Sequence, residues 1–532
     1  MTRTNFIGRI IGLIIVFVIG LTINYLALPA WNLRSPGLYF FLLVMGIIAT
    51  IVFAIVEIED EKVFTAVFGF ATLAVIVVMI IFSALSGTMF NAKRYHNLLT
   101  IENGEFSDVV DADSANLSVV DVGTAQKLGD RTIAGVKNST WYDVDNEYNL
   151  IMYHGDQYRI SAINYGGLFK YQKAKYYGIP GYVLVNCKTQ EAKLITLENP
   201  INYSPSAYFS KNLLRHLRNQ YPSYVFGTSF FEIDEEGYPY WITATKDATI
   251  GIWGGKLEIR FVITDACTGE SKVYATKGLP KWVDHAYDLG YLMSMVEYNM
   301  SLINGYWNFS HTGVNRTSYS YKGNGFAGYN TTVTSNGEVV FFTGVTPFNK
   351  AESILGFLLA NPRTGVVKYY PCNGAEESSA QAAAYSLVQN YGYTANYPTM
   401  VNVDGVPTYF MMLKDSAGLV QRYALCNVEN YTIVVEDTTL EKALKSYRAR
   451  LGSKAVTTDE TLSITGTIQN VYTAEIDGYT YFYFTLNGEE GLYMSSIVNS
   501  NRQVILREGS KVTIEYTESP ENGVYLVTKI EF

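Results

Sequence analysis

"VITDACTGESKVY", residues 262–274, places a Thr-Gly turn between two stretches that have the apolar pattern of β-strands. Much the same phrase recurs as "LVNCKTQEAKL" from Leu184, "LLANPRTGVVKYY" from Leu358 and "ALCNVENYTIVV" from Ala424. A catalytic motif is expected once and gathers reactive side chains, whereas this phrase recurs where the chain must turn. We therefore interpret it as the structural turn of a repeated scaffold.

A second kind of hairpin precedes this phrase. "FFEIDEEGYPYWIT" from Phe230, "TTVTSNGEVVFFTG" from Thr331 and "MVNVDGVPTYFMML" from Met400 each place Gly with Asp or Asn between two strand patterns. These turn residues indicate hairpins because they tolerate a positive φ. Helical patterns separate the hairpins: "SAYFSKNLLRHLRNQ" from Ser206, "PKWVDHAYDLGYLMSMVEYNM" from Pro280, "AEESSAQAAAYSLVQN" from Ala375 and "DTTLEKALKSYRARL" from Asp437. The repeated unit is thus a β-hairpin, a second β-hairpin and a helix.

The hairpin that ends in a Thr-Gly turn beside a helix resembles the PepSY domain, a small α+β module of exported and membrane-anchored bacterial proteins, sometimes linked to the restraint of peptidases. Three further stretches are similar to an uncharacterised family of membrane-anchored proteins from Gram-positive bacteria. They are "RHLRNQYPSYVFGTSFFEIDEEGYPYW" from Arg215, "GAEESSAQAAAY" from Gly374 and "LKDSAGLVQRYALCNVE" from Leu413. This similarity spans Arg94 to Tyr447 and implies a location and an architecture rather than a chemistry.

Three apolar runs open the chain: Phe6–Leu28, Gly37–Val56 and Val63–Leu85. Each has about the 20 residues that an α-helix needs to cross a hydrocarbon core of about 30 Å. A cleavable signal peptide would instead show one shorter apolar stretch and a small-residue cleavage site. We expect a multi-pass protein of the cell membrane that contacts the lipid bilayer through residues 6–85.

The charges beside these runs bear on membrane orientation. Each side of the membrane would carry three basic residues: Arg3, Arg9 and Lys62 on one side, and Arg34, Lys93 and Arg94 on the other. Because the first helix often dominates, we expect a cytoplasmic N-terminus and an extracytoplasmic C-terminal region. The Tyr-, Asn-, Thr- and Gly-rich composition that follows is typical of an exported, β-rich surface.

The pattern changes after Gly452. "LSITGTIQNVYTAEI", "YTYFYFTLNG", "GLYMSSIV", "KVTIEYTE" and "VYLVTKIEF" read as five strands, with "NSNRQVILREGS" between the third and the fourth. This arrangement resembles the OB-fold, a five-stranded Greek-key barrel. Barrels of this kind that hold single-stranded nucleic acid need a basic groove, but Ser463–Phe532 contains four basic and nine acidic residues. We expect no nucleic acid partner, and we expect the alternating aromatic side chains to be divided between the barrel interior and a protein-binding outer face.

The sequence therefore predicts an α+β fold class with several units, because 532 residues exceed what one core usually organises. Four segments follow from the patterns above. They are a three-helix transmembrane anchor (1–92), a polar, acidic stalk or linker (93–140), a repeated PepSY-like ectodomain of β-hairpins and helices (141–452) and an OB-like β-barrel (453–532).

Reactive side chains form no recognisable motif, so we assign no catalytic, cofactor-binding or metal-ligating residue. The histidines are scattered, and none has the spacing of a metal site: His96, His154, His216, His285 and His311. Asp284 and His285 are neighbours in a predicted helix, where adjacent side chains point about 100° apart. We therefore expect both to be solvated on the surface.

The stretch "YDVDNEYN" places carboxylates at alternate positions, as calcium-binding loops do: Asp143, Asp145 and Glu147. It lacks the Gly and the downstream Glu of an EF-hand, so a solvated acidic turn is favoured over a calcium site. The cysteines lie beside the repeated turns: Cys187, Cys267, Cys372 and Cys426. An external domain could pair them, but equivalent positions of repeats more often fill small core sites, so free, partly buried thiols are expected.

These patterns favour a noncatalytic, membrane-anchored envelope protein that presents a β-rich domain for protein or envelope contacts, without a cofactor. The alternative, which the resemblance to PepSY domains implies, is a regulatory module that restrains a membrane or exported peptidase. An enzyme would require a cluster of perturbed ionisable groups in a cleft. The net charge of −9 gives no general attraction to nucleic acid.

Overall fold

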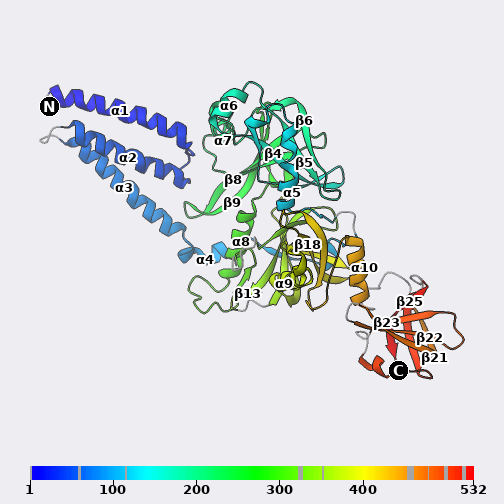
Figure 1. Ribbon diagram of the computed structural model, residues 1–532. Coiled ribbons are helices and arrows are strands. Elements are labelled where there is room, and N and C mark those ends of the chain that lie inside the picture. Colours follow the sequence, from blue (N-terminus) through cyan, green and yellow to red (C-terminus); the bar gives the residue numbers. More distant parts are fainter. Residues whose placement is uncertain are drawn as a thin grey trace.

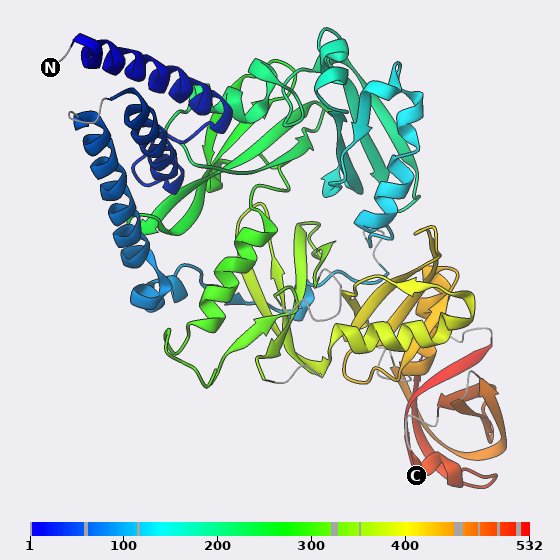
Figure 2. The ribbon, with the colours of Figure 1, turned by 60° about the vertical axis from the view of Figure 1, so that its left-hand side comes forward.

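The computed structural model describes residues 3–57, 62–113, 117–320, 328–349, 353–451, 461–476, 479–496, 501–517 and 523–532. Three long helices lie at one end of the molecule, four β-sheets occupy its middle and a barrel lies at the other end (Figure 1). A view turned by 60° shows the helices and the barrel on opposite sides of the sheets (Figure 2). The architecture is a mixed helix and sheet fold with a β-rich C-terminal region.

Helices α1 (Arg3–Ala27), α2 (Pro36–Val56) and α3 (Val63–Ser86) confirm the three predicted apolar helices. All three are long and apolar enough to cross a membrane. At the end of the bundle away from the sheets, the Glu57 carboxylate accepts hydrogen bonds from Arg9 Nε at 2.7 Å and from the main-chain N–H of Thr65 at 3.0 Å. Glu57 thus neutralises a buried arginine and caps α3.

Each of the four sheets contains a meander of four antiparallel strands. The first meander comprises β3 (Asn149–Tyr153), β4 (Asp156–Tyr165), β5 (Ile179–Asn186) and β6 (Ala192–Ile201). The second comprises β7 (Phe226–Ile233), β8 (Pro239–Ile250), β9 (Gly254–Asp265) and β10 (Ser271–Ala275). The third comprises β12 (Asn330–Val333), β13 (Val339–Pro347), β14 (Ser353–Ala360) and β15 (Val367–Ala375). The fourth comprises β17 (Thr399–Val403), β18 (Val406–Lys414), β19 (Val420–Asn427) and β20 (Val434–Asp437).

Short strands extend three of these sheets at their edges. They include β2 (Tyr142–Val144) beside β4, β11 (Asn315–Thr317) beside β13 and β16 (Thr394–Ala395) beside β18. The helices of this region are α4 (Thr88–His96), α5 (Val122–Gly129), α6 (Leu168–Ala174), α7 (Leu213–Gln220), α8 (Leu289–Ser301), α9 (Glu377–Val388) and α10 (Leu440–Leu451).

Two predicted helices begin later than their patterns suggest. The helix expected from Ser206 begins at Leu213, where Asn212 accepts a hydrogen bond from the main-chain N–H of Arg215 at 3.1 Å. The helix expected from Pro280 begins at Leu289, after the capping residue Asp288. In both cases a side-chain cap fixes the first turn. Before α7 the chain forms only the short 3-10 helix Phe209–Lys211, and residues 280–288 before α8 are not helical.

Helices α8 and α9 fill the space between neighbouring sheets. Leu292 of α8 shares a buried cluster with Phe261 of the second sheet and Leu358 of the third. Ala384 of α9 shares another cluster with Tyr409 of the fourth sheet and with residues of the third. Because burial stabilises by about 25 cal/mol per Å² of apolar surface, these shared cores hold the repeats together.

The segment 93–140 belongs to the repeated domain, which corrects its prediction as a stalk. Strand β1 (Ile101–Asn103) pairs in parallel with β15. Val110, Leu117 and Val120 are buried in the core that contains the first sheet. The segment is polar overall, but single apolar residues lie between the polar ones. A folded segment can bury these apolar residues on one side while the polar residues face outward.

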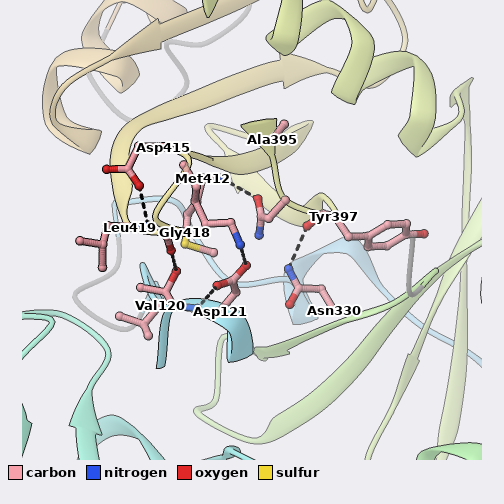
Figure 3. A network of polar contacts seen from close by, with 12 residues as sticks. Val120, Asp121, Asn330, Ala395, Tyr397, Met412, Asp415, Gly418 and Leu419 are labelled. Carbon is pink, nitrogen blue, oxygen red and sulfur yellow. Dashed lines mark hydrogen bonds and ion pairs between the residues drawn. The ribbon is translucent and has the colours of Figure 1, made fainter. Parts of the chain in front are cut away.

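Asp121 fixes this segment to the fourth sheet (Figure 3). One carboxylate oxygen of Asp121 accepts from the N–H of Thr124 at 2.8 Å, capping α5, and the other accepts from Lys414 Nζ of β18 at 2.6 Å. Burial opposes ionisation of Asp121, but the lysine and the N–H group together lower its pKa. The Thr124 hydroxyl also donates to the carbonyl of Gly418, in the turn after β18.

The C-terminal strands form a closed barrel in the order β21-β22-β23-β25-β24. They are β21 (Thr461–Ile476), β22 (Tyr479–Leu486), β23 (Leu492–Ser496), β24 (Lys511–Thr517) and β25 (Val524–Glu531). Phe482, Phe484 and Leu486 alternate into a core that the barrel residues form among themselves. The outward Tyr481 is nevertheless buried, and its hydroxyl donates to the carbonyl of Ala449 in α10 at 3.3 Å.

Candidate functional site

The histidines occupy separate places in the structure. Three contact main-chain carbonyl groups: His96 with Asn299, His154 with Glu235 and His216 with Gly269. His311 stacks on the ring of Phe348. Among the described residues, no group of three or more His, Cys, Asp or Glu could hold a metal ion.

Asp284 and His285 are buried, which corrects their prediction as surface residues of a helix. Both lie in the loop before α8, and their side chains contact the sheets instead of solvent. The two carboxylate oxygens of Glu232, in β7, accept from the main-chain N–H groups of Asp284 at 2.8 Å and His285 at 2.5 Å. The His285 ring contacts the same carboxylate at 3.0 Å. Asp284 in turn accepts from the N–H of Met152 in β3.

The environment of this acidic cluster perturbs all three ionisable groups. Burial raises the pKa of Glu232 to about 8, and burial with the nearby Glu232 charge raises the pKa of Asp284 to about 8. Burial lowers the pKa of His285 to about 4. The cluster can therefore retain a proton at neutral pH. Each of the three residues is at most 6% exposed, and their hydrogen bonds join the first and second sheets.

Sequence reasoning passed over Glu232. Its signal was a single acidic residue inside the apolar strand "SFFEI", where a charge is costly unless hydrogen-bonded. Its partners lie about 50 residues further along the chain, since the two contacts span separations of 52 and 53 residues. Local spacing cannot reveal such a pair.

Of the alternating carboxylates, Asp143 lies in strand β2, and Asp145 and Glu147 lie in the segment between β2 and β3. One oxygen of Asp145 accepts from the N–H of Glu147 at 3.1 Å, and the other accepts from Asn164 Nδ2 at 2.8 Å. Burial, with the charges of Asp145 and Asp288, raises the pKa of Glu147. The preference for a solvated acidic turn over a calcium loop stays a prediction from the sequence.

The cysteines are free thiols. Cys187, Cys267 and Cys426 are buried, and Cys372 is partly buried. Burial raises the pKa of Cys372 to about 11 and that of Cys426 to about 12. A thiol with a raised pKa is mostly protonated at neutral pH and is a poor nucleophile. The structure therefore gives these residues a packing role.

The repeated turn is built by the side chain at its start. The carboxylate of Asp265 accepts from the main-chain N–H of Cys267 and Thr268, and Asn361 accepts in the same way from Arg363 and Thr364. Asn186 does so in the first sheet, with Lys188 and Thr189. Side chains that bond their own backbone are common in turns. The repeated phrase, of which "VITDACTGESKVY" is one copy, is thus a structural turn.

The tip of the β8–β9 hairpin contacts the ends of the apolar helices (Figure 1). Ser86, the last residue of α3, accepts at 3.0 Å from the N–H groups of Ile252 and Trp253. The Trp253 ring packs edge-on against Tyr39 of α2 and Phe82 of α3, with centroids 5.2 and 5.5 Å apart. This contact fixes the second sheet beside the ends of the helices.

A second contact lies beside the first. The loop after α1 runs along α7, where Arg218 Nε donates to the carbonyl of Leu28 at 3.1 Å and the N–H of Trp31 donates to the carbonyl of Pro222 at 2.9 Å. Arg34 and Arg94 reach main-chain carbonyls of β8. The membrane-proximal face, defined by the β8–β9 tip, α7 and the loop after α1, is the candidate functional site.

No protein-family model matches the chain, and no curated protein is significantly similar to it. Among solved structures, it is similar to Trypanosoma rangeli sialidase in complex with 2,3-difluoro-KDN, with 9% identity over 72% of this chain and 52% of that chain and a TM-score of 0.15. The same sialidase with the inhibitor DANA gives 9% identity, 72% and 53% coverage and a TM-score of 0.13. The chain spans about half the length of these sialidases, and at such TM-scores they give no argument about its fold or activity.

Proposed function

We propose that the protein is a noncatalytic envelope scaffold, anchored in the cell membrane by α1 to α3, that holds its sheets and barrel on the extracytoplasmic side for protein or envelope contacts. The observation that carries this proposal is the attachment of the β8–β9 tip to Ser86 and to the aromatic rings of α2 and α3. A domain held at several points beside the ends of membrane helices presents its outer surface at a fixed distance and angle. The buried state of Glu232, Asp284 and His285 supports a noncatalytic role.

The repeats and the barrel fit the families that the sequence resembles. Four meanders with a helix beside them support a PepSY-like identity, and a five-stranded closed barrel supports an OB-like one. The PepSY resemblance also supports a second candidate, a module that restrains a membrane or exported peptidase. A peptidase that copurifies with the protein, and whose activity rises on release, would favour restraint over a scaffold.

The scaffold proposal requires the sheets to lie outside the cytoplasm. Protease added to intact, wall-stripped cells should then degrade residues beyond Lys93 and leave a fragment that contains α1 to α3. The measurement is immunoblotting of the two ends of the chain, with a cytoplasmic protein as the control for lysis. Complete protection of the sheets until the cells are lysed would contradict the proposal.

A further inference from the structure

A cavity of about 780 Å³ lies on the membrane-proximal face, between the C-terminal end of α1 and helix α7. Its walls include Leu21 and Tyr25 from α1, Trp31 from the following loop, and Arg215 and Arg218 from α7. One wall therefore belongs to a helix long and apolar enough to cross a membrane, and the other belongs to the repeated domain. A ligand in this cavity would contact both.

The α7 wall is cationic. Arg215 donates to the carbonyl of Tyr25 at 2.5 Å, and Arg218 donates to the carbonyls of Leu28 at 3.1 Å and Pro222 at 3.1 Å. Within the part of the chain that the structure describes, neither arginine forms an ion pair with a carboxylate, and the Nε of Arg215 is buried without a hydrogen-bond partner. Carbonyl groups satisfy donors but leave the positive charges uncompensated. Burial accordingly lowers the pKa of Arg218.

The α1 wall has the character of a membrane interface. The guanidinium of Arg215 lies over the ring of Tyr25, 3.7 Å from its centroid. Leu21, Tyr25 and Trp31 are each about half exposed, so the protein leaves apolar and aromatic surface beside the charges. Tyr and Trp are enriched where membrane helices meet the headgroup layer. The ligand that matches both walls has an anionic group for the arginines and an apolar chain for α1.

We propose that this cavity binds an anionic phospholipid, with its phosphate at Arg215 and Arg218 and an acyl chain along Leu21 and Tyr25 of α1. Arg is well suited to phosphate because its guanidinium keeps its charge and donates charge-assisted hydrogen bonds. A soluble anion would use the arginines but leave the apolar wall uncovered. The lipid would thereby join the anchor to the repeated domain.

The test uses the full-length protein in nanodiscs of phosphatidylcholine alone or with phosphatidylglycerol, and measures bound lipid by native mass spectrometry together with the melting temperature. Arg215→Gln should reduce retention of phosphatidylglycerol about tenfold, as expected for one charge-assisted hydrogen bond, with little change for phosphatidylcholine. Arg94→Gln is the matched control. Like Arg215, Arg94 donates to a main-chain carbonyl at this face, here that of Thr249 in β8, but it does not line the cavity. It should retain lipid like the wild type.

Asn219→Asp supplies a variant that leaves the arginine contacts intact, since Asn219 is an exposed residue of the cavity wall. Its added negative charge should also weaken phosphatidylglycerol retention. Equal losses in Arg215→Gln and Arg94→Gln would overturn the proposal, because they would indicate general attraction to an anionic surface. Stabilisation by inorganic phosphate alone, equal to that by phosphatidylglycerol, would also overturn it in favour of a soluble anion.

Discussion

The second and fourth meanders have the same strand order but contact different neighbours. Strands β8 and β9 have 12 residues each, whereas β18 and β19 have nine and eight. The longer hairpin carries its tip to Ser86 at the end of α3, while the shorter one ends at Gly418, beside α5. Lengthening one hairpin thus gives a repeat a new partner without altering the core that it shares with the helices.

The largest effect is expected from a substitution in the tip of the longer hairpin, β8–β9. A side chain at Gly254 would place its Cβ 2.3 Å from the hydroxyl of Tyr95 and 2.4 Å from the carbonyl of Ser86. Both atoms belong to the attachment, because Tyr95 donates to that carbonyl at 2.7 Å. Gly254→Val should therefore lower the free energy of unfolding of the detergent-solubilised protein by about 3 kcal/mol, measured by chemical denaturation.

Substitutions at two other glycines serve as controls for Gly254→Val. At Gly418, in the shorter tip, φ is +80° but the nearest atom to an added Cβ is 3.6 Å away, so Gly418→Val should cost about 1 kcal/mol from backbone strain alone. Gly278 has open space around it, so Gly278→Ala should change stability by less than about 0.5 kcal/mol. If Gly254→Val were no worse than Gly418→Val, the tip would not be a firm attachment.

The second meander also differs from the fourth in its charge. In the second meander the acidic Glu232 lies two residues before Asp234 of the turn. At the corresponding position of the fourth meander, the uncharged Asn402 lies two residues before Asp404. The pKa values of Glu232 and Asp284, about 8 in the folded protein, exceed their ordinary values of 4.5 and 3.8. The folded state therefore binds more protons than the unfolded state, and stability falls as pH rises toward 8. His285 contributes little above pH 7, because it is then neutral in both states.

Between pH 7 and pH 8 each raised carboxyl group should reduce the free energy of unfolding by up to about 1.4 kcal/mol. Asp284→Asn removes one of these two contributions, while its amide oxygen can still accept from the N–H of Met152. Chemical denaturation at several pH values should thus show a steeper decline for the wild type than for the variant. Asn402→Asp introduces a carboxyl group at the corresponding position of the fourth meander. It tests whether a carboxyl group there also makes the free energy of unfolding depend on pH. Parallel pH curves for the wild type and Asp284→Asn would contradict the assigned cause.

The comparison also shows which features a sequence pattern can predict. The hairpins and their turns depend on adjacent residues, and the positive φ of Gly269 (+84°) and Gly365 (+74°) agrees with their assignment as turn residues. The burial of Asp284 and His285 depends on Glu232, which lies on another element, and the membrane-proximal cavity depends on α1 meeting α7. Such contacts are long-range, so periodicity and spacing carry no signal for them.

A smaller effect than that of Gly254→Val is expected at the turn before the last strand of a meander. In the second meander this turn contains Gly269, whereas in the fourth Asn427 accepts from the N–H of Asn430 at 2.7 Å without a glycine at that point. Val at Gly269 would have to adopt φ near +84°, and its Cβ would lie 2.6 Å from the Tyr203 ring. Because the tip of that ring can shift, the main cost is backbone strain, and Gly269→Val should destabilise by about 1 kcal/mol in thermal unfolding.

The neighbouring Glu270 provides the control for this turn. Its exposed carboxylate lies 3.3 Å from Lys272, and exposed pairs contribute little because water screens them. Glu270→Gln should therefore leave both the unfolding temperature and the function of the protein in cells unchanged. A variant at Glu270 that is fully stable yet inactive in cells would show that the turn carries chemistry, and the repeated phrase would then have to be interpreted as a functional motif. A Gly269→Val variant as stable as the wild type would instead show that the second meander tolerates the same glycine-free turn as the fourth.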